Sequence, residues 1–170
     1  MRVLIINGSH RRGNCFRFAE EANEILKKKH DVNIFNLIEM NIKDCTGCLA
    51  CEEGEDCPVC DDFSNLIEPV LKHADLLIIA TPTYFNMPSA ATVKFINRTN
   101  KLCEFFGENQ KKCLYYLVGQ TDRDTIMEAY NCLHSYGEIM NMKEIAQPII
   151  HVARMVESVP DDAINTLNNI

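Results

Sequence analysis

The chain has 170 residues, of which 46% are hydrophobic and 24% are charged, and its formal net charge is −7. This length fits one domain with a sizeable core, and the acidic balance argues against nonspecific nucleic-acid binding, which needs a basic surface. No apolar run approaches the length of a membrane span, and the chain begins with a strand pattern rather than a secretion signal. We therefore expect a single cytoplasmic domain over residues 1–170, with no membrane or nucleic acid as partner.

The first stretch of the chain is typical of an anion-binding loop. Residues 3–6 form an unbroken apolar run, as expected of a strand buried in a parallel sheet. They lead into small residues and two arginines at 8–14, and a helical pattern follows. Backbone N–H groups at such a helix start bind anions. Ser9 adds a hydroxyl donor, and Arg11 or Arg12 adds a planar cation suited to phosphate.

Two better-known phosphate loops do not match this stretch. The spacing from Gly8 to Gly13 is that of a P-loop, but Asn14 and Cys15 stand where that motif needs Lys and Ser or Thr. A dinucleotide-binding fingerprint needs three glycines and an acidic residue at the end of the second strand, and that pattern is absent. An ordinary strand-to-helix turn remains the alternative interpretation of the loop taken alone.

The rest of the chain alternates between strand and helix patterns. After the first strand, the sequence predicts strands at about 32–38, 75–81 and 113–118 and within 145–152, and helices at about 14–29, 61–71, 89–106 and 124–139 and within 161–167. This alternation, without repeats or linkers, is typical of a three-layer α/β domain around one parallel sheet. Right-handed crossovers leave two main strand orders, and one of them places the second strand outside the first.

Three unusual loops then meet at one edge of the predicted sheet, because ligands bind where parallel strands end. They are Gly8–Cys15, Pro82–Pro88 and Gly119–Gln120. In the second loop, prolines stiffen the chain, and its backbone amides suit the polar edge of a flat heterocycle, with Tyr84 and Phe85 near its plane. The alternative is that these two aromatic side chains only cover the end of the core.

A cysteine-rich loop over residues 44–60 is the second informative stretch. Nine cysteines are many for a reducing compartment, and clustered thiols there suggest metal or redox chemistry. Four closely spaced thiolates can ligate a 4Fe–4S cluster. Two C-x-x-C units, at 45–48 and 57–60, are instead suited to tetrahedral zinc. A loop that binds no metal is the third interpretation, and all three stay open.

These motifs, in this order, resemble the NADPH-dependent FMN reductase family of the flavodoxin-like superfamily, and within it the iron–sulfur flavoproteins. The resemblance covers nearly the whole chain, and the residues that carry it are Gly8, Ser9, Arg11, Gly13, Asn14, Cys45 to Cys57, Asp61, Asp62 and Thr81 to Tyr84. It implies a three-layer flavodoxin-like fold, with a five-stranded parallel sheet in the order 2-1-3-4-5, helices on both faces and an FMN cofactor.

The resemblance also implies the site residues. The first loop holds the FMN phosphate, and the loop after the third strand holds the isoalloxazine. Cys15 stands where the family often has Thr and His10 where it often has Pro. Because a thiol is a weak donor, phosphate binding at Cys15 should rest on its backbone N–H. The expected FMN contacts are Ser9, Arg11, Gly13, Asn14, Cys15, Pro82, Thr83, Tyr84, Phe85, Asn86, Gly119 and Gln120, and the expected ligands of a 4Fe–4S cluster are Cys45, Cys48, Cys51 and Cys57.

The implied activity is that of an FMN-dependent oxidoreductase. It would pass electrons from NAD(P)H, or from a reduced carrier such as ferredoxin, to a small or protein acceptor. The flavin carries the chemistry, so no side chain is expected to be catalytic. The alternatives are a flavodoxin-like electron carrier without its own substrate, and a plain FMN reductase without a metal cluster.

Two further expectations concern what contacts the chain. Exposed Tyr84, Phe85 and Met87 need cover, and the family places its flavin at a subunit contact, so we expect a homodimer or homotetramer. No basic cluster clearly awaits the NADPH 2′-phosphate. Arg98, Lys101 or residues of a partner subunit could serve instead.

Overall fold

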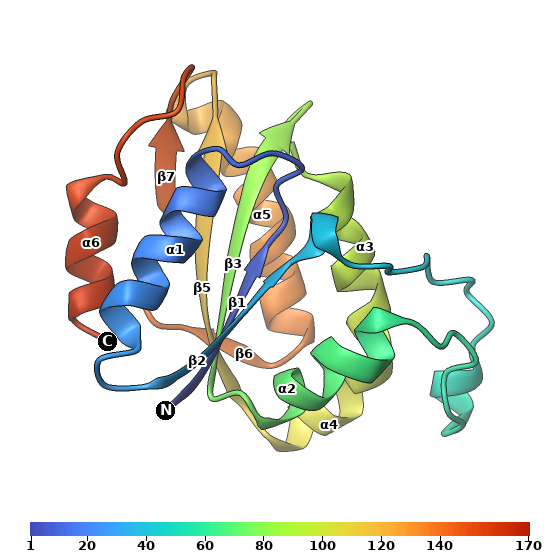
Figure 1. Cartoon of the computed structure of the whole chain (residues 1–170). Helices are drawn as coiled ribbons and strands as arrows, with labels where there is room; N and C mark the ends of the chain where they lie inside the picture. The colour runs from blue at the N-terminus through green and yellow to red at the C-terminus, as the bar shows by residue number, and fades with distance from the viewer.

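Five main strands form a parallel sheet in the computed structural model, which describes residues 1–170 (Figure 1). The strand pairing gives the order β2-β1-β3-β5-β7. This confirms the expected flavodoxin-like order 2-1-3-4-5. The strands are β1 (Arg2–Asn7), β2 (Asp31–Asn36), β3 (Leu76–Tyr84), β5 (Lys111–Gly119) and β7 (Ile149–Val152).

The last edge of the sheet differs from the prediction. The strand expected within 145–152 is β7, which pairs with the end of β5, but a short β6 (Met142–Glu144), which was not predicted, pairs with the beginning of β5. Pro148 lies in the gap between them, where it has no N–H to donate to a strand ladder. The edge is therefore divided into two short strands.

The predicted loop over 82–88 is a β-hairpin. Strand β3 continues to Tyr84, and β4 (Met87–Pro88) returns antiparallel to it. Phe85 and Asn86 form the two-residue turn, with φ of 49° and 60°. Two consecutive positive φ values are the mark of a type I′ hairpin turn, which suits the twist of the paired strands. A phenylalanine rarely adopts this conformation, so the sequence alone did not indicate the turn.

Helices cover both faces of the sheet, as expected (Figure 1). One layer contains α1 (Asn14–Leu26) and α6 (Asp161–Asn168). The other contains α2 (Glu68–His73), α3 (Ala90–Arg98), α4 (Cys103–Glu108) and α5 (Arg123–Ile139). Short 3-10 turns lie at Leu37–Glu39, Ala50–Glu53 and Thr99–Leu102.

Two predicted helices are divided or reshaped. The helix expected over 89–106 ends at Arg98, turns through Thr99–Leu102 and resumes as α4. The helix expected over 61–71 begins with one wide π-helical turn at Phe63–Ile67 before α2. This turn leaves Leu66 half exposed, although the predicted apolar face includes it. None of the helices has both the length and the apolar surface needed to cross a bilayer.

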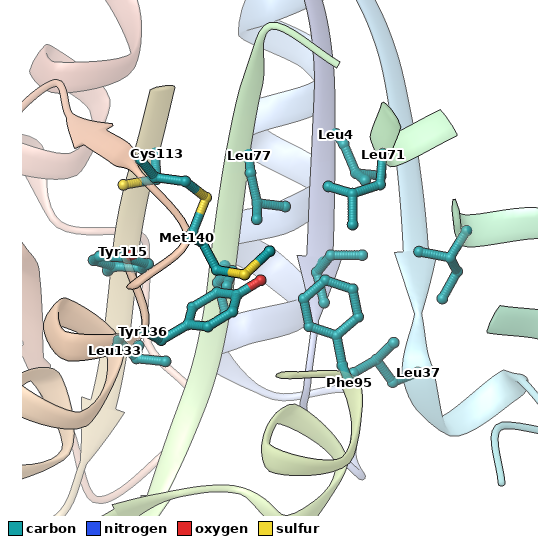
Figure 2. Packing of buried hydrophobic residues seen from close by; sticks show 14 of the residues in the cluster. Leu4, Leu37, Leu71, Leu77, Phe95, Cys113, Tyr115, Leu133, Tyr136 and Met140 are labelled. Atoms are coloured by element: carbon teal, nitrogen blue, oxygen red, sulfur yellow. The ribbon is translucent and has the colours of Figure 1, made fainter. Parts of the chain in front are cut away.

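The two cores follow the alternation of side chains along each strand. Leu4 and Leu77 point to the face covered by α2 to α5, where Phe95 and Tyr136 fill the space between sheet and helices (Figure 2). The side chain of Val3, which points the opposite way from that of Leu4, lies on the face covered by α1 and α6. Burial on both sides holds the strand ends, and the loops after them, in fixed positions.

Candidate functional site

A cavity of about 380 Å³ lies at the carboxyl ends of β1, β3 and β5. Every expected FMN contact except Gly13 lines it, so the structure brings the three predicted loops together. Val118, Thr121 and Ala153 also line it, and the sequence did not indicate them. The complete lining is Ser9, Arg11, Asn14, Cys15, Pro82, Thr83, Tyr84, Phe85, Asn86, Val118, Gly119, Gln120, Thr121 and Ala153.

Ser9 organises the first loop from inside. Its backbone N–H donates to Asn7 Oδ1 at 3.1 Å. Its hydroxyl donates to the Arg11 carbonyl at 2.8 Å and accepts the Arg11 N–H at 3.3 Å. The side chain is almost fully buried. Ser9 therefore fixes the course of the loop, and its hydroxyl proton is already engaged.

The first turn of α1 supplies unpaired donors. The backbone N–H groups of Asn14, Cys15 and Phe16 have no hydrogen-bond acceptor within the protein, as is usual at a helix start. No acidic side chain occupies this turn. Asn14 and Cys15 line the cavity, and the positive end of the helix dipole adds to the attraction. We call this turn, together with Arg11, the phosphate cradle.

The two arginines of the loop have different surroundings. Arg11 lines the cavity and forms no ion pair. The Arg12 guanidinium lies 5.0 Å from the centre of the Phe16 ring, and its Nη2 is 3.6 Å from Glu39 Oε1. The structure therefore favours Arg11, of the two candidates, as the cation that meets an anion in the cavity.

The side chains of Asn14 and Cys15 make their contacts elsewhere in the protein and not in the phosphate cradle. The Asn14 amide bonds to the backbone of Met155 and Glu157. The Cys15 side chain is packed in the core, and burial raises the pKa of its thiol far above the usual value. Cys15 thus stays neutral, and what it offers an anion is its unpaired backbone N–H.

A buried hydroxyl network, which the sequence analysis missed, joins the first loop to β3 and α3. The Ser89 hydroxyl donates to the Gly8 carbonyl at 2.6 Å, and the Thr92 hydroxyl donates to Thr81 Oγ1 at 2.9 Å. All three hydroxyl side chains are fully buried. A Cβ on Gly8 would lie 1.9 Å from Thr92 Oγ1, so only glycine fits there. The only sequence signal was Ser89 at a helix start.

The hairpin on the other side of the cavity is held at its tip and at its base. Asn86 Nδ2 donates to Glu128 Oε2 of α5 at 2.8 Å, and Thr83 Oγ1 donates to the Val118 carbonyl at 3.4 Å. A Cβ on Gly119 would lie 2.5 Å from Thr83 Oγ1, so this close approach needs glycine. The hairpin therefore has a defined position relative to the cavity.

The cavity fits a phosphorylated flat heterocycle. The phosphate cradle lies at one side, where unpaired N–H groups and Arg11 favour an anion. Tyr84 and Phe85 lie at the other, with exposed fractions of 48% and 96%. Because FMN combines a phosphate with a planar ring, the chemistry of these donors and side chains suits it.

The cysteine-rich loop projects from the body beside α3 (Figure 1). Its base is closed by a fully buried ion pair between Arg98 and Asp61. Arg98 also donates to the Lys43 carbonyl at 3.1 Å and to the Val59 carbonyl at 3.0 Å, and Asp61 accepts the Lys43 N–H at 2.8 Å. We call these contacts the clasp, because they hold both ends of the loop together.

The clasp determines the charge of Asp61. Burial alone would raise the pKa of this carboxyl, but hydrogen bonds from Arg98 and from the backbone N–H groups of Lys43 and Ser64 outweigh burial and hold the pKa below its usual value. Arg98 is thus fully engaged, and Lys101 is paired with Glu68 at 3.1 Å. The buried ion pair removes Arg98 as a candidate for the NADPH phosphate, and Lys101 stays an untested candidate.

The loop does not gather its cysteines. No three His, Cys, Asp or Glu side chains lie close enough together to hold a metal ion. Cys45, Cys48 and Cys60 are exposed, and Cys51 and Cys57 are half-buried. The donor set, several accessible thiols within one loop, has the chemistry that soft metals prefer, but the geometry of a site is not formed.

Together, the sheet order and the cavity at its carboxyl edge define a flavodoxin-like α/β protein whose first loop presents unpaired N–H donors to that cavity. Residues 1–156 match the NADPH-dependent FMN reductase family. The chain belongs to this oxidoreductase family, which confirms the resemblance drawn from its sequence.

Named relatives agree with this assignment. The iron–sulfur flavoprotein of Archaeoglobus fulgidus is 37% identical over 100 residues, which are 58% of this chain and 49% of that protein. Iron–sulfur flavoprotein MJ1083 of Methanocaldococcus jannaschii is 32% identical over 104 residues, 60% and 53% of the two chains. The chain thus spans about half the length of these relatives. A WrbA-like flavodoxin from Agrobacterium tumefaciens shares the fold, with a TM-score of 0.66 and 15% identity over 99% of this chain and 91% of that one.

Proposed function

We propose that the protein is an FMN-dependent oxidoreductase that accepts electrons from NAD(P)H or a reduced carrier such as ferredoxin and passes them to a small or protein acceptor. The observation that carries this proposal is the convergence of the phosphate cradle and the aromatic hairpin on one cavity. Bound FMN would supply the electron-transfer chemistry. Membership of the NADPH-dependent FMN reductase family supports the nicotinamide donor.

The chain's own residues bind and orient the cofactor. Arg11 and the N–H groups of the α1 start would hold the phosphate, and Ser9 fixes the loop that carries them. The Ser89 hydroxyl bond to Gly8 sets the first loop against the start of α3. Phe85, at the tip of a hairpin held from both ends, would cover the ring plane.

The phosphate assignment is tested with two flavins. Arg11→Ala should weaken FMN binding about 10- to 100-fold, the equivalent of a charge-assisted hydrogen bond, and leave riboflavin binding nearly unchanged. Arg12→Ala, which removes a guanidinium already paired with Glu39, is the matched control and should change neither. Equal losses of FMN and riboflavin in Arg11→Ala would refute the assignment.

A second candidate function is that of an electron carrier without its own substrate. The fold it shares with a WrbA-like flavodoxin keeps this candidate open. Steady-state oxidation of NADH or NADPH with a quinone or dye as acceptor separates the two. In this assay an oxidoreductase oxidises many nicotinamide molecules per flavin, whereas a carrier shows no steady oxidation of the nicotinamide.

We also propose that the protein forms a homodimer or homotetramer through the hairpin. Tyr84, Phe85 and Met87 expose 48%, 96% and 58% of their surfaces, side by side along one hairpin. Burial of such apolar surface favours association. Light scattering at micromolar concentration with FMN bound should give at least twice the mass of one chain, and Phe85→Ser should reduce it. A monomeric mass for the unmodified protein would contradict the proposal.

For the cysteine-rich loop, we propose a 4Fe–4S cluster held by Cys45, Cys48, Cys51 and Cys57. The names of the relatives and the four accessible thiols support it, and the loop would have to rearrange to bring the sulfurs together. Anaerobic reconstitution should then give about four irons and four sulfides per chain. Cys51→Ala should abolish iron binding and Cys60→Ala should not. The zinc alternative predicts the reverse, and a plain FMN reductase retains no metal.

A further inference from the structure

The side chain of Asn14 joins two parts of the chain that lie 141 residues apart in sequence. Its Nδ2 donates to the Met155 carbonyl at 2.9 Å, and its Oδ1 accepts the Glu157 N–H at 2.8 Å. Both ends of the carboxamide are therefore engaged, and the residue is only 9% exposed. The resemblance implies that Asn14 contacts the phosphate, but one Nδ2–H donor and the Oδ1 acceptor of its side chain are already used to hold residues 155 and 157.

The segment that Asn14 holds, residues 153–157, forms part of the wall of the flavin cavity; we call it the strap. Ala153 lines the cavity, and its N–H donates to the Gly119 carbonyl at the end of β5, at 2.8 Å. The strap thus runs from one wall of the cavity to the start of α1. Met155 is largely exposed and Val156 about half exposed, so little apolar packing holds the middle of the strap in place.

We propose that Asn14 is a positioning residue: it clamps the strap against the phosphate cradle and so shapes the cavity around the whole flavin, rather than binding the phosphate. This inference rests on the proposed FMN site. The backbone N–H of Asn14 remains one of the cradle donors, and a change of side chain does not remove it. The side chain should therefore matter equally for a flavin with and without a phosphate.

The comparison of FMN with riboflavin tests this directly. Asn14→Ala should weaken both by the same factor, about tenfold, which is the scale of one hydrogen bond. Asn23→Ala makes the same chemical change on the same helix, where the side chain forms no hydrogen bond, and should change neither. A loss of FMN binding alone would mean that Asn14 is a phosphate ligand. Unchanged binding of both flavins would mean that the strap does not shape the flavin site. Either outcome overturns the proposal.

A second measurement follows the strap itself, without any flavin. Arg154 is exposed within the strap, so trypsin reports on its attachment. Cleavage after Arg154 should be at least severalfold faster in Asn14→Ala than in the unmodified protein, and saturating FMN should slow it. An unchanged cleavage rate would overturn the clamp.

Variants on the strap side keep the test independent of Asn14. Glu157→Pro removes the N–H that Asn14 accepts and should reproduce both the flavin loss and the faster cleavage, whereas Glu157→Gln keeps this N–H and a polar side chain near His151 and should not. If the two variants behave alike, the clamp is overturned. If the unmodified protein binds neither flavin, the proposed function fails, while the cleavage rates still decide whether Asn14 holds the strap.

Discussion

The cavity at the sheet edge and the cysteine-rich loop differ in how far the chain alone has organised them. At the cavity, buried hydroxyls, two glycines in close contacts and a hairpin held at both ends place the predicted residues together. In the loop, only the base is organised, by the clasp, and the thiols beyond it remain apart.

The difference shows what each kind of site requires from the protein. A phosphate needs donors that exist in any helix start, so a rigid sheet edge can prepare the site before the ligand arrives. A metal cluster supplies the attraction that draws its own thiolates together, so the chain needs only to bring the loop ends into place. In this chain the clasp holds the two ends of the loop together. The following variants are chosen to test this contrast.

The largest effect is expected when the clasp is broken. Arg98→Met leaves Asp61 buried without its partner and should lower the free energy of unfolding by about 3–5 kcal/mol, measured by urea denaturation. Lys94→Met removes a surface pair with Asp44 and should cost less than about 1 kcal/mol. If the two variants are equally stable, the clasp is not the anchor that its burial indicates.

The preformed cavity is tested by Gly8→Ala. The new Cβ would lie 1.9 Å from Thr92 Oγ1, so the hydroxyl network must shift, with a cost of about 1–3 kcal/mol in unfolding free energy. FMN affinity should fall as well, because the first loop moves away from β3. Gly107→Ala is the control: nothing lies within 4 Å of its Cβ position in α4, and alanine favours a helix. A stable Gly8→Ala protein with normal FMN affinity would show that the network is not needed.

Acid should weaken the clasp before it affects the hydroxyl network, which carries no charge. The pKa of Asp61 is lower in the folded protein than in the unfolded chain, so its contribution is complete above the unfolded value of about 3.9 and is lost as pH falls through the folded value. Urea denaturation from pH 7 down to about pH 2 should show this loss below about pH 4, and Asp61→Asn should show a shallower one. Parallel curves for the two proteins would contradict the role of this carboxylate.

The sequence predicted the parts of the site that depend on neighbours in the chain. The apolar run at residues 3–6 and the small residues after it indicated a strand, a loop and a helix start, and the family resemblance identified the hairpin residues. Contacts between distant residues were not visible. Nothing near Asn14 indicates that its amide meets Glu157, and nothing near Ser89 indicates that its hydroxyl meets Gly8.

Two further differences have local causes. The clasp was missed because an arginine at the end of a helix, as Arg98 is, is usually exposed, and only the fold shows its burial. For the cysteine-rich loop, the spacing of the cysteines indicates a set of candidate ligands, but spacing alone does not fix how far apart the sulfurs lie in the fold.

The smallest expected effect concerns the tip of the hairpin. Glu128→Ala removes the exposed acceptor of Asn86 Nδ2 and should cost no more than about 1 kcal/mol in unfolding free energy, because water replaces an exposed hydrogen bond readily. Since the base of the hairpin is still held by Thr83 against Val118, FMN affinity should fall only about two- to threefold, which corresponds to a few tenths of a kcal/mol in binding free energy.

The control is Glu138→Ala, which removes a carboxylate from the same helix next to His134, away from the hairpin, and should leave FMN affinity unchanged. A loss of tenfold or more in Glu128→Ala would mean that the tip, rather than the base, positions the hairpin, and that this side of the cavity is less preformed than the phosphate cradle.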